Sequence, residues 1–368
     1  MHVLVTGSNG FIGQNLIVHL NELETYNVLT FSRENSIDEL KELISQADAI
    51  IHLAGENRPA DVSTFNIVNT ELTQLLCDEV RSSGRLIPIL FASSIQADFD
   101  NPYGRSKLAA EIIFEKLVIE TGNPVFIYRL PGVFGKWCRP NKHSVVATFC
   151  NNIANGLPIQ INEPSKELTL VYIDDVVTEF INAINPQLEN HTTLAVSPEY
   201  KISVGELALQ INNFRNCRKS LVSEQVGNGL IRLLYSAYTS YLPPDQFSYS
   251  VPVYSDHRGL FVEMLKTKDS GQFSFFTAHP GVTRGGHYHH SKTEKFMVIR
   301  GTARFGFRHV VNNESHEIVT NGNESIVVDT VPGWTHDITN IGDDDLIVML
   351  WSNEIFNRDN PDTIVSEV

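Results

Sequence analysis

Thr6-Gly7-Ser8-Asn9-Gly10-Phe11-Ile12-Gly13 is the stretch that decides the fold of the first half of the chain. It follows the apolar run 3–6 and precedes residues 11–20, whose apolar side chains recur at helical spacing. Glycines three positions apart permit a tight turn, close approach of the backbone to a pyrophosphate, and close packing of helix on strand. The pattern therefore favours a dinucleotide site over a plain strand-to-helix turn.

The residues up to about 180 alternate short apolar runs with longer helical patterns. Strands are expected at 3–6, 27–31, 49–53, 87–92 and 125–129, and helices between them at 11–20, 70–82 and 106–120. Strands joined by helical crossovers form a parallel sheet that is covered on both faces. The sequence predicts a doubly wound α/β domain of the Rossmann type.

After about residue 250 the pattern changes to short β-type runs. These are expected at 261–265, 273–276, 296–299, 303–307, 325–328 and 346–351, and several are separated by glycine-containing turns. This pattern is typical of an all-β sandwich or barrel. We place the domain boundary near residue 245, which gives domains 1–244 and 245–368, with the helical stretches 204–214 and 229–241 at the end of the first.

Composition excludes several classes of protein. With 42% hydrophobic and 19% charged residues the 368-residue chain is typical of a folded protein, and its net charge of −15 disfavours nucleic acid as a partner. It has no run of about 18 apolar residues that would span a membrane, and its start has no signal-peptide pattern. Four widely spaced cysteines indicate neither a disulfide framework nor a zinc knuckle. We expect a cytoplasmic protein with no membrane partner.

Tyr103 and Lys107 stand four positions apart at the start of an expected helix, so their side chains share one face. An ammonium group next to a tyrosine favours the phenolate and lowers the tyrosine pKa toward the range useful for proton transfer. Upstream, the strand 87–92 runs into two serines, Ser93 and Ser94.

These residues, together with the glycine turn and the tract Asp48-x-x-x-His52-Leu53-Ala54-Gly55, resemble the extended short-chain dehydrogenase/reductase family. The resemblance implies that Ser94, Tyr103 and Lys107 are catalytic, with Ser93 as the alternative to Ser94. Many family members separate the serine from the tyrosine by some two dozen residues, whereas the gap here is nine. The loop over the site is therefore short, and we expect substrate recognition from residues 128–141.

The end of the second strand discriminates between cofactors, because an acid there binds the ribose 2′-hydroxyl of NAD and a basic residue accommodates the 2′-phosphate of NADP. The strand ends in Phe31-Ser32-Arg33 and carries no acid, so NADPH is favoured, with Arg58 as a second candidate for the phosphate. The full set of expected cofactor-binding residues is Gly7, Asn9, Gly10, Phe11, Ile12, Gly13, Arg33, Leu53, Ala54, Gly55, Tyr103 and Lys107.

Residues 281–301 fit the first motif of the cupin family, and residues 331–340 resemble its second. Alternate residues of a strand share a face, so two histidines two positions apart converge into the interior. Three imidazoles and a carboxylate suit Zn²⁺, although Fe²⁺, Mn²⁺ or Ni²⁺ are possible, and the ion is either catalytic or structural. The expected ligands are His287, His289, Glu294 and His336, with His290 as an alternative to His289.

The whole chain resembles the bifunctional capsular-polysaccharide enzymes of the UDP-N-acetyl-L-fucosamine pathway. The resemblance implies NADPH-dependent reduction at C4 of a UDP-2-acetamido-2,6-dideoxy-4-hexulose to the L-talose sugar, and epimerisation at C3 in a zinc-binding cupin domain, where His290 and Tyr288 are candidate bases. Two alternatives remain open: an epimerase that uses tightly held NAD, and a catalytically silent nucleotide-binding scaffold whose cupin serves oligomerisation. We expect a homodimer.

Overall fold

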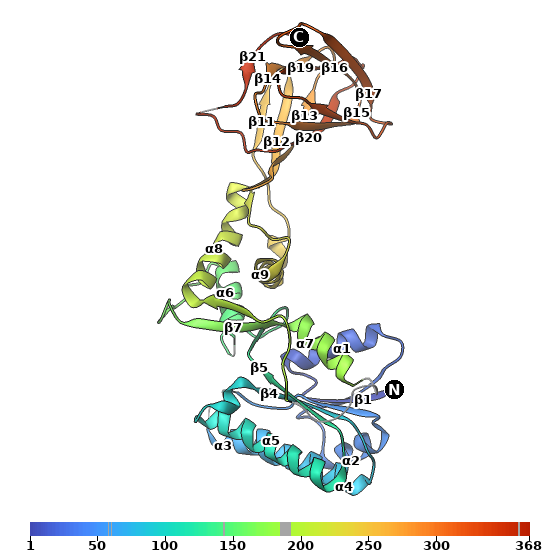
Figure 1. The fold of residues 1–368 in the computed structure, drawn as a ribbon, viewed down its shortest axis with the longest axis vertical. Coiled ribbons are helices and arrows are strands. Elements are labelled where there is room, and N and C mark those ends of the chain that lie inside the picture. The colour runs from blue at the N-terminus through green and yellow to red at the C-terminus, as the bar shows by residue number, and fades with distance from the viewer. Residues whose placement is uncertain (58, 60, 143, 185–192, 360) are drawn as a thin grey trace. The chain divides into compact units, whose positions relative to one another are not determined.

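The computed structural model describes residues 1–57, 59, 61–142, 144–184, 193–359 and 361–368 (Figure 1). The chain divides into two compact units, one of residues 1–211 and 232–242 and the other of residues 212–231 and 243–368. The boundary that we predict near residue 245 assigns residues 212–231 to the first domain, whereas the structure groups these residues with the second unit. There β10 (Val222–Ser223) pairs in parallel with β12 (Gly259–Thr267).

A six-stranded parallel sheet forms the centre of the first unit. Its order is β2-β1-β3-β4-β5-β8, and each neighbouring pair is parallel. The strands are β1 (His2–Thr6), β2 (Asn27–Phe31), β3 (Ala49–His52), β4 (Ile89–Ser94), β5 (Val125–Leu130) and β8 (Thr193–Leu194). The chain reverses direction across the sheet between β1 and β3, which makes the carboxyl ends of these strands the expected place for a ligand.

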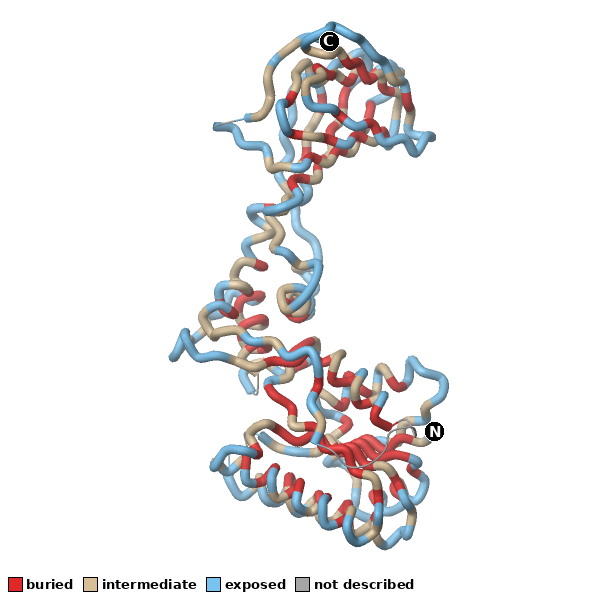
Figure 2. Tube along the Cα trace, viewed as in Figure 1, coloured by how far each residue is buried: buried red, intermediate tan, exposed pale blue. Residues whose placement is uncertain are grey.

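Helices cover both faces of this sheet, as the sequence predicts. Figure 1 shows α2, α4 and α5 on one face and α1 and α7 on the other, and Figure 2 shows that burial concentrates in the strands and in the inner helix faces. The helices of the chain are α1 (Phe11–Glu22), α2 (Ile37–Gln46), α3 (Ser63–Phe65), the π-helical η1 (Asn66–Glu71), α4 (Leu72–Ser83), the 3₁₀ turn η2 (Ile95–Asp98), α5 (Pro102–Thr121), α6 (Val145–Ala154), α7 (Ile173–Ala183), α8 (Val204–Ser220), α9 (Gly229–Thr239) and η3 (Pro244–Gln246).

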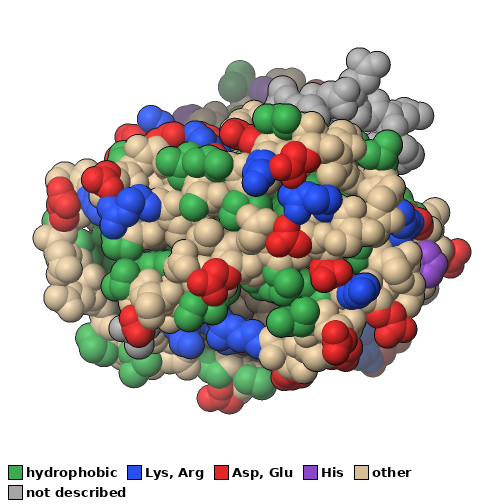
Figure 3. Space-filling view, turned by 90° about the horizontal axis from the view of Figure 1, so that it is seen from below, with side chains coloured by type: hydrophobic (Ala, Val, Ile, Leu, Met, Phe, Trp, Pro, Cys, Tyr) green, Lys and Arg blue, Asp and Glu red, His purple; other side chains and the backbone are tan. Residues whose placement is uncertain are grey.

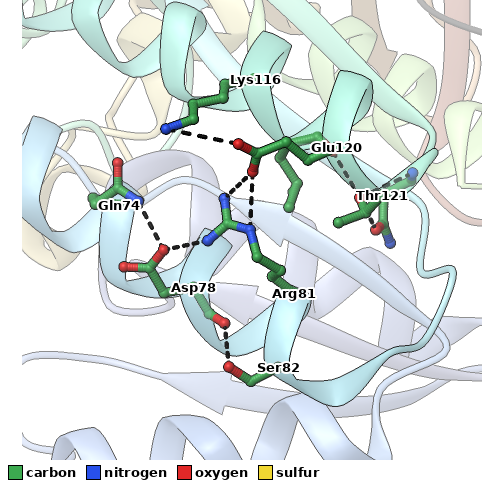
Figure 4. Close-up of polar contacts among 9 residues, drawn as sticks. Gln74, Asp78, Arg81, Ser82, Lys116, Glu120 and Thr121 are labelled. Atoms are coloured by element: carbon green, nitrogen blue, oxygen red, sulfur yellow. Dashed lines mark hydrogen bonds and ion pairs between the residues drawn. The ribbon is translucent and has the colours of Figure 1, made fainter.

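Ion pairs join the outer sides of α4 and α5 (Figure 4). Arg81 donates to Asp78 on its own helix at 2.5 Å and to Glu120 on the neighbouring helix at 2.7 and 3.0 Å. These side chains are partly exposed, so each pair adds at most about 1 kcal/mol. Acidic and basic side chains are interspersed on the face drawn in Figure 3.

Because exposed ion pairs contribute so little, most of the packing energy comes from the buried apolar core beside the sheet, which includes Leu4, Ile50 and Phe91.

A small three-stranded sheet completes the first unit. β6 (Gly132–Phe134) pairs in parallel with β7 (Glu167–Tyr172), which pairs antiparallel with β9 (Tyr200–Ser203).

Two facing antiparallel sheets make up most of the second unit and confirm the predicted all-β cupin fold. One contains β11 (Val253–Asp256), β12, β13 (Gly271–Ala278), β15 (Glu294–Arg300), β18 (Val327–Thr330) and β20 (Leu346–Ser352); the other contains β14 (Thr283–Tyr288), β16 (Thr302–His309), β17 (Ser315–Asn321), β19 (Trp334–Asn340) and β21 (Ile364–Val365). Apolar side chains from both sheets, such as Phe296, Phe305 and Val348, form one core. Across the described residues, no helix combines the length and the apolar character needed to cross a bilayer.

Candidate functional site

The glycine turn packs against the loop that follows β3. Gly7 has φ +68°, and a Cβ there would lie 2.7 Å from the backbone nitrogen of Ala54. A Cβ on Gly13 would lie 2.5 Å from the carbonyl oxygen of Gly7, so these two positions need glycine for backbone packing. Gly10 is the N-cap of α1 and has no side chain to occupy the first N–H groups of the helix. The turn thus presents open backbone to an anion, as a pyrophosphate site requires.

A buried histidine fixes the loop after β3. The Thr73 hydroxyl donates to the Asn69 carbonyl at 2.7 Å, so it accepts from His52 Nε2–H at 3.0 Å. The opposite nitrogen, Nδ1, then accepts from the Thr6 hydroxyl at 2.8 Å, and that oxygen accepts from the Ala54 N–H at 3.2 Å. Burial lowers the pKa of His52 to about 3, so it stays neutral and holds this network across the pH range of enzymes.

A single 3₁₀ turn, η2, lies between Ser94 and Tyr103, which stand nine positions apart. Ser94 caps η2 by accepting from Gln96 N–H at 3.2 Å, and Asn101 caps α5 by accepting from Gly104 N–H at 2.8 Å. A Cβ on Gly104 would lie only 2.1 Å from the Gln96 carbonyl oxygen. This close approach of α5 to η2 brings Tyr103 into hydrogen-bonding contact with Ser94.

The neighbouring serine is engaged elsewhere. The Ser93 hydroxyl donates to Glu111, which is buried and also receives Arg129 Nη2 at 2.6 Å. Of the two serine candidates, therefore, Ser94 lies against Tyr103.

The electrostatics of the site suit a proton donor. Burial raises the pKa of Tyr103 above its ordinary value, and the hydrogen bond with Ser94 opposes this only in part. The sequence predicts that the Lys107 ammonium lowers the pKa of Tyr103, and the structure differs: the causes that act on this pKa are burial and Ser94. The Lys107 ammonium instead donates to the Ala92 carbonyl oxygen at 2.8 Å. Burial lowers the pKa of Lys107 itself to about 8, while Glu111 acts in the opposite direction. A Cβ on Gly55 would lie 3.3 Å from Lys107 Nζ, so the loop after β3 adjoins the lysine.

Arg33 lies beyond the end of β2, and its side chain is 78% exposed. It donates to Glu56, the residue after Gly55, at 2.9 Å. The guanidinium that we expect at a 2′-phosphate is therefore paired with a carboxylate in this structure. The second candidate for that phosphate, Arg58, lies outside the described residues.

The second unit gathers all four predicted metal ligands. Their ligand atoms, from His287, His289, Glu294 and His336, lie within 4.8 Å of one another. A register shift in β14 between Gly285 and His287 precedes the first of them. Burial lowers the pKa of His287 to about 4, so its ring is neutral at physiological pH. Burial alone would raise the pKa of Glu294, but the neighbouring rings of His289 and His336 and the charge of Lys292 hold it well below the usual range.

These residues fit a divalent cation. His289 Nδ1 contacts the Asp362 carbonyl oxygen, which can only accept, so this nitrogen carries the proton and Nε2 presents a lone pair. That lone pair faces Glu294 Oε2 at 3.2 Å, and two acceptors at this distance need a proton or a cation between them. His336 Nε2 lies 3.6 Å from the same oxygen. Tetrahedral zinc with bonds of about 2.1 Å would hold its ligand atoms roughly 3.4 Å apart.

His290 lies outside this cluster. It is exposed, and its ring packs edge-on against Tyr288 with centroids 5.4 Å apart. Of the two adjacent histidines, His289 therefore points toward Glu294.

Sequence reasoning missed two acids of the first unit. Glu111 continues the four-residue spacing of Tyr103 and Lys107 on α5, so the helical pattern contains the signal that finds it. Glu56 approaches Arg33 only through the pairing of β1 with β2 and β3, and its position in the sequence alone gives no such signal.

Comparisons with known proteins agree with the division of the chain into an α/β unit and an all-β unit. Residues 3–193 match the NAD dependent epimerase/dehydratase family, and residues 254–364 match the polysaccharide biosynthesis C-terminal domain.

Similar proteins cover the whole chain. It is 61% identical to UDP-2-acetamido-2,6-beta-L-arabino-hexul-4-ose reductase of Pseudomonas aeruginosa, over 100% of this chain and 99% of the relative. The crystal structure of the capsular polysaccharide assembling protein CapF from Staphylococcus aureus has a TM-score of 0.93 and 40% identity, with both chains fully covered. UDP-glucuronic acid 4-epimerase from Bacillus cereus with NAD shares only the fold, at 18% identity and a TM-score of 0.53 over 59% of this chain and 84% of the other. These similarities confirm the predicted pairing of an α/β domain with a cupin.

Proposed function

The chain belongs to the NAD dependent epimerase/dehydratase family, and from that premise we propose that it reduces the C4 ketone of a UDP-2-acetamido-2,6-dideoxy-4-hexulose with NADPH. We further propose that the cupin unit epimerises the same sugar at C3, in the synthesis of UDP-N-acetyl-L-fucosamine for capsule or O-antigen polysaccharide.

The observation that carries the proposal is the contact between Ser94 and Tyr103 beside buried Lys107. It lies at the carboxyl end of β4, in the same sheet as the glycine turn that follows β1. Reduction of a ketone needs a proton donor at the carbonyl oxygen, and a tyrosine with a raised pKa is protonated at neutral pH.

Each residue has a role that its position supports. The Tyr103 hydroxyl donates its proton to the carbonyl oxygen, and Ser94 donates a hydrogen bond that orients that oxygen. Lys107 supplies a positive charge beside the Gly55 loop, where a ribose hydroxyl can bind. A bound reduced nicotinamide would supply the hydride.

The choice of NADPH rests on Arg33. It lies two positions after the end of β2, and the end of this strand offers no carboxylate to a 2′-hydroxyl, since the residues there are Thr30, Phe31 and Ser32. Release of Arg33 from Glu56 would free its guanidinium for a 2′-phosphate.

In the second unit we propose that His287, His289, Glu294 and His336 hold Zn²⁺. A cation there would supply positive charge that acidifies a proton next to a ketone.

The test follows NADPH oxidation by absorbance, with the 4-keto sugar generated in situ from UDP-N-acetylglucosamine by a 4,6-dehydratase. Wild-type enzyme should oxidise NADPH in proportion to the sugar, and Tyr103→Phe should lower kcat by about 10²–10⁴-fold. Tyr26→Phe, which changes a tyrosine between α1 and β2, serves as the matched control.

A parallel arm removes metal with a chelator and determines the C3 configuration of the product by NMR. Reduction that continues with a changed C3 configuration would assign epimerisation to the cupin. Absence of net NADPH oxidation by the wild type would contradict the reductase and favour the NAD-dependent epimerase, and full activity of Tyr103→Phe would contradict the assigned proton donor.

A further inference from the structure

The carboxylate of Asp362 organises the loop that follows β14. Its Oδ1 accepts from the His290 N–H at 2.8 Å, and its Oδ2 accepts from the N–H groups of Ser291 and Lys292 at 2.7 and 2.9 Å. The Ser291 hydroxyl adds a further bond at 2.8 Å. The Asp362 carboxylate is thus the shared acceptor for four donors of residues 290–292.

The same residue contacts a metal-ligand candidate through its backbone. Its carbonyl oxygen accepts the Nδ1 proton of His289 across 73 positions of sequence. This bond selects the tautomer whose Nε2 lone pair faces Glu294. Hydrogen bonds of this kind orient a ligand ring and increase its basicity.

The organised loop also reaches the carboxylate of the cluster. Lys292 is 8% exposed, and its ammonium lies 2.7 Å from Glu294 Oε1. One oxygen of Glu294 is thereby occupied, which leaves Oε2 directed at His289 and His336. Two of the four candidate ligands thus depend on residues that Asp362 holds in place.

The segment around Asp362 is anchored independently of its carboxylate. Ile364 and Val365 of β21 pair with Tyr288 and His287 of β14, and Ser366 N–H donates to the Gly286 carbonyl at 3.0 Å. A side-chain substitution at Asp362 therefore removes the loop contacts while the strand pairing remains.

We propose that Asp362 is a positioning residue of the cupin metal centre, which fixes His289 and Glu294 for the ion through the loop 290–292. This inference rests on the metal site proposed above. It predicts that the ion is bound less tightly, and in a different geometry, when the carboxylate is lost.

The experiment titrates metal-free full-length protein with Zn²⁺ alone in competition with a chromophoric chelator, and with Co²⁺ to record the d–d absorption of the bound ion. Asp362→Asn keeps the shape and the backbone carbonyl but replaces one carboxylate oxygen by an NH₂ group, which cannot accept. We expect it to bind Zn²⁺ roughly 10–100-fold more weakly, as is typical for partners of metal ligands, with an altered Co²⁺ spectrum. Asp359→Asn, a nearby exposed acid, is the matched control.

Ser291→Ala removes one of the four donors and is the milder variant, for which we expect an intermediate loss; it decides the question if Asp362→Asn fails to fold by circular dichroism. Wild-type affinity and an unchanged Co²⁺ spectrum in the folded variants would overturn the role of Asp362 while the metal site stands. A wild-type protein that binds no Zn²⁺ would overturn the site itself and this inference with it.

Discussion

Gly104 lies so close to Gln96 that a Cβ on the glycine would be 2.1 Å from the Gln96 carbonyl oxygen and 2.4 Å from that of Phe99. Real Cβ atoms do not approach backbone oxygens to this distance, so any side chain here moves α5 away from η2. Tyr103 precedes the glycine directly and would move with it, away from Ser94.

We therefore expect Gly104→Ala to lower kcat about 100-fold, since displacement of a reacting group by about 1 Å has effects of this size. Overpacking should also lower the free energy of unfolding by about 1–3 kcal/mol. Steady-state NADPH oxidation and thermal unfolding measure the two effects. Leu108→Ala, on the exposed side of the same helix, is the control, and a Gly104→Ala enzyme as active as that control would contradict the packing argument.

Lys107 predicts an alkaline limit to cofactor use. Burial lowers its pKa to about 8, so the free enzyme loses this positive charge as pH rises through about 8. Tyr103 does not account for a loss in this range, because its pKa is raised and it stays protonated there. We expect kcat/KM for NADPH to fall above about pH 8, since this parameter reports groups of the free enzyme. A profile flat to pH 10 would contradict this assignment.

Glu111 should shift that profile. Its carboxylate favours the ammonium form of Lys107, so Glu111→Gln should lower the lysine pKa further and move the alkaline limb to lower pH. The substitution also removes the charge of the buried carboxylate that pairs with Arg129 at 2.6 Å and leaves that arginine the more exposed Asp98 at the same distance, so it should cost about 2 kcal/mol of stability. Glu115→Gln, an exposed acid one turn along α5, controls for helix effects. The combination of a shifted profile and lower stability distinguishes this role from a purely structural one, which would leave the pH profile unchanged.

Local patterns predict much of this molecule. The glycine turn, the pair Tyr103 and Lys107, and the cluster from His287 to Glu294 are each encoded within about twenty residues, so spacing alone identifies them. The contacts that position these groups come from residues far away in the sequence. Asp362 reaches His289 across 73 positions, through pairing of two strands whose register no periodicity reveals. The short spacing of Ser94 and Tyr103 is visible in the sequence, but the close packing of α5 on the 3₁₀ turn η2 depends on the absence of a side chain at Gly104.

Arg33 and Glu56 together predict how the enzyme discriminates between NADPH and NADH. Arg33→Ala should raise KM for NADPH about tenfold, equivalent to about 1.4 kcal/mol, and should leave KM for NADH unchanged, because only NADPH carries the 2′-phosphate. Glu56→Gln should have the opposite effect on NADPH, since it removes the acid that holds Arg33 at 2.9 Å and repels a phosphate. Initial rates measure KM for NADPH and KM for NADH in each variant relative to the wild type. Glu34→Gln, which changes an exposed acid next to Arg33, is the control. Equal changes in KM for both cofactors would place Arg33 outside phosphate recognition and reopen the assignment of NADPH.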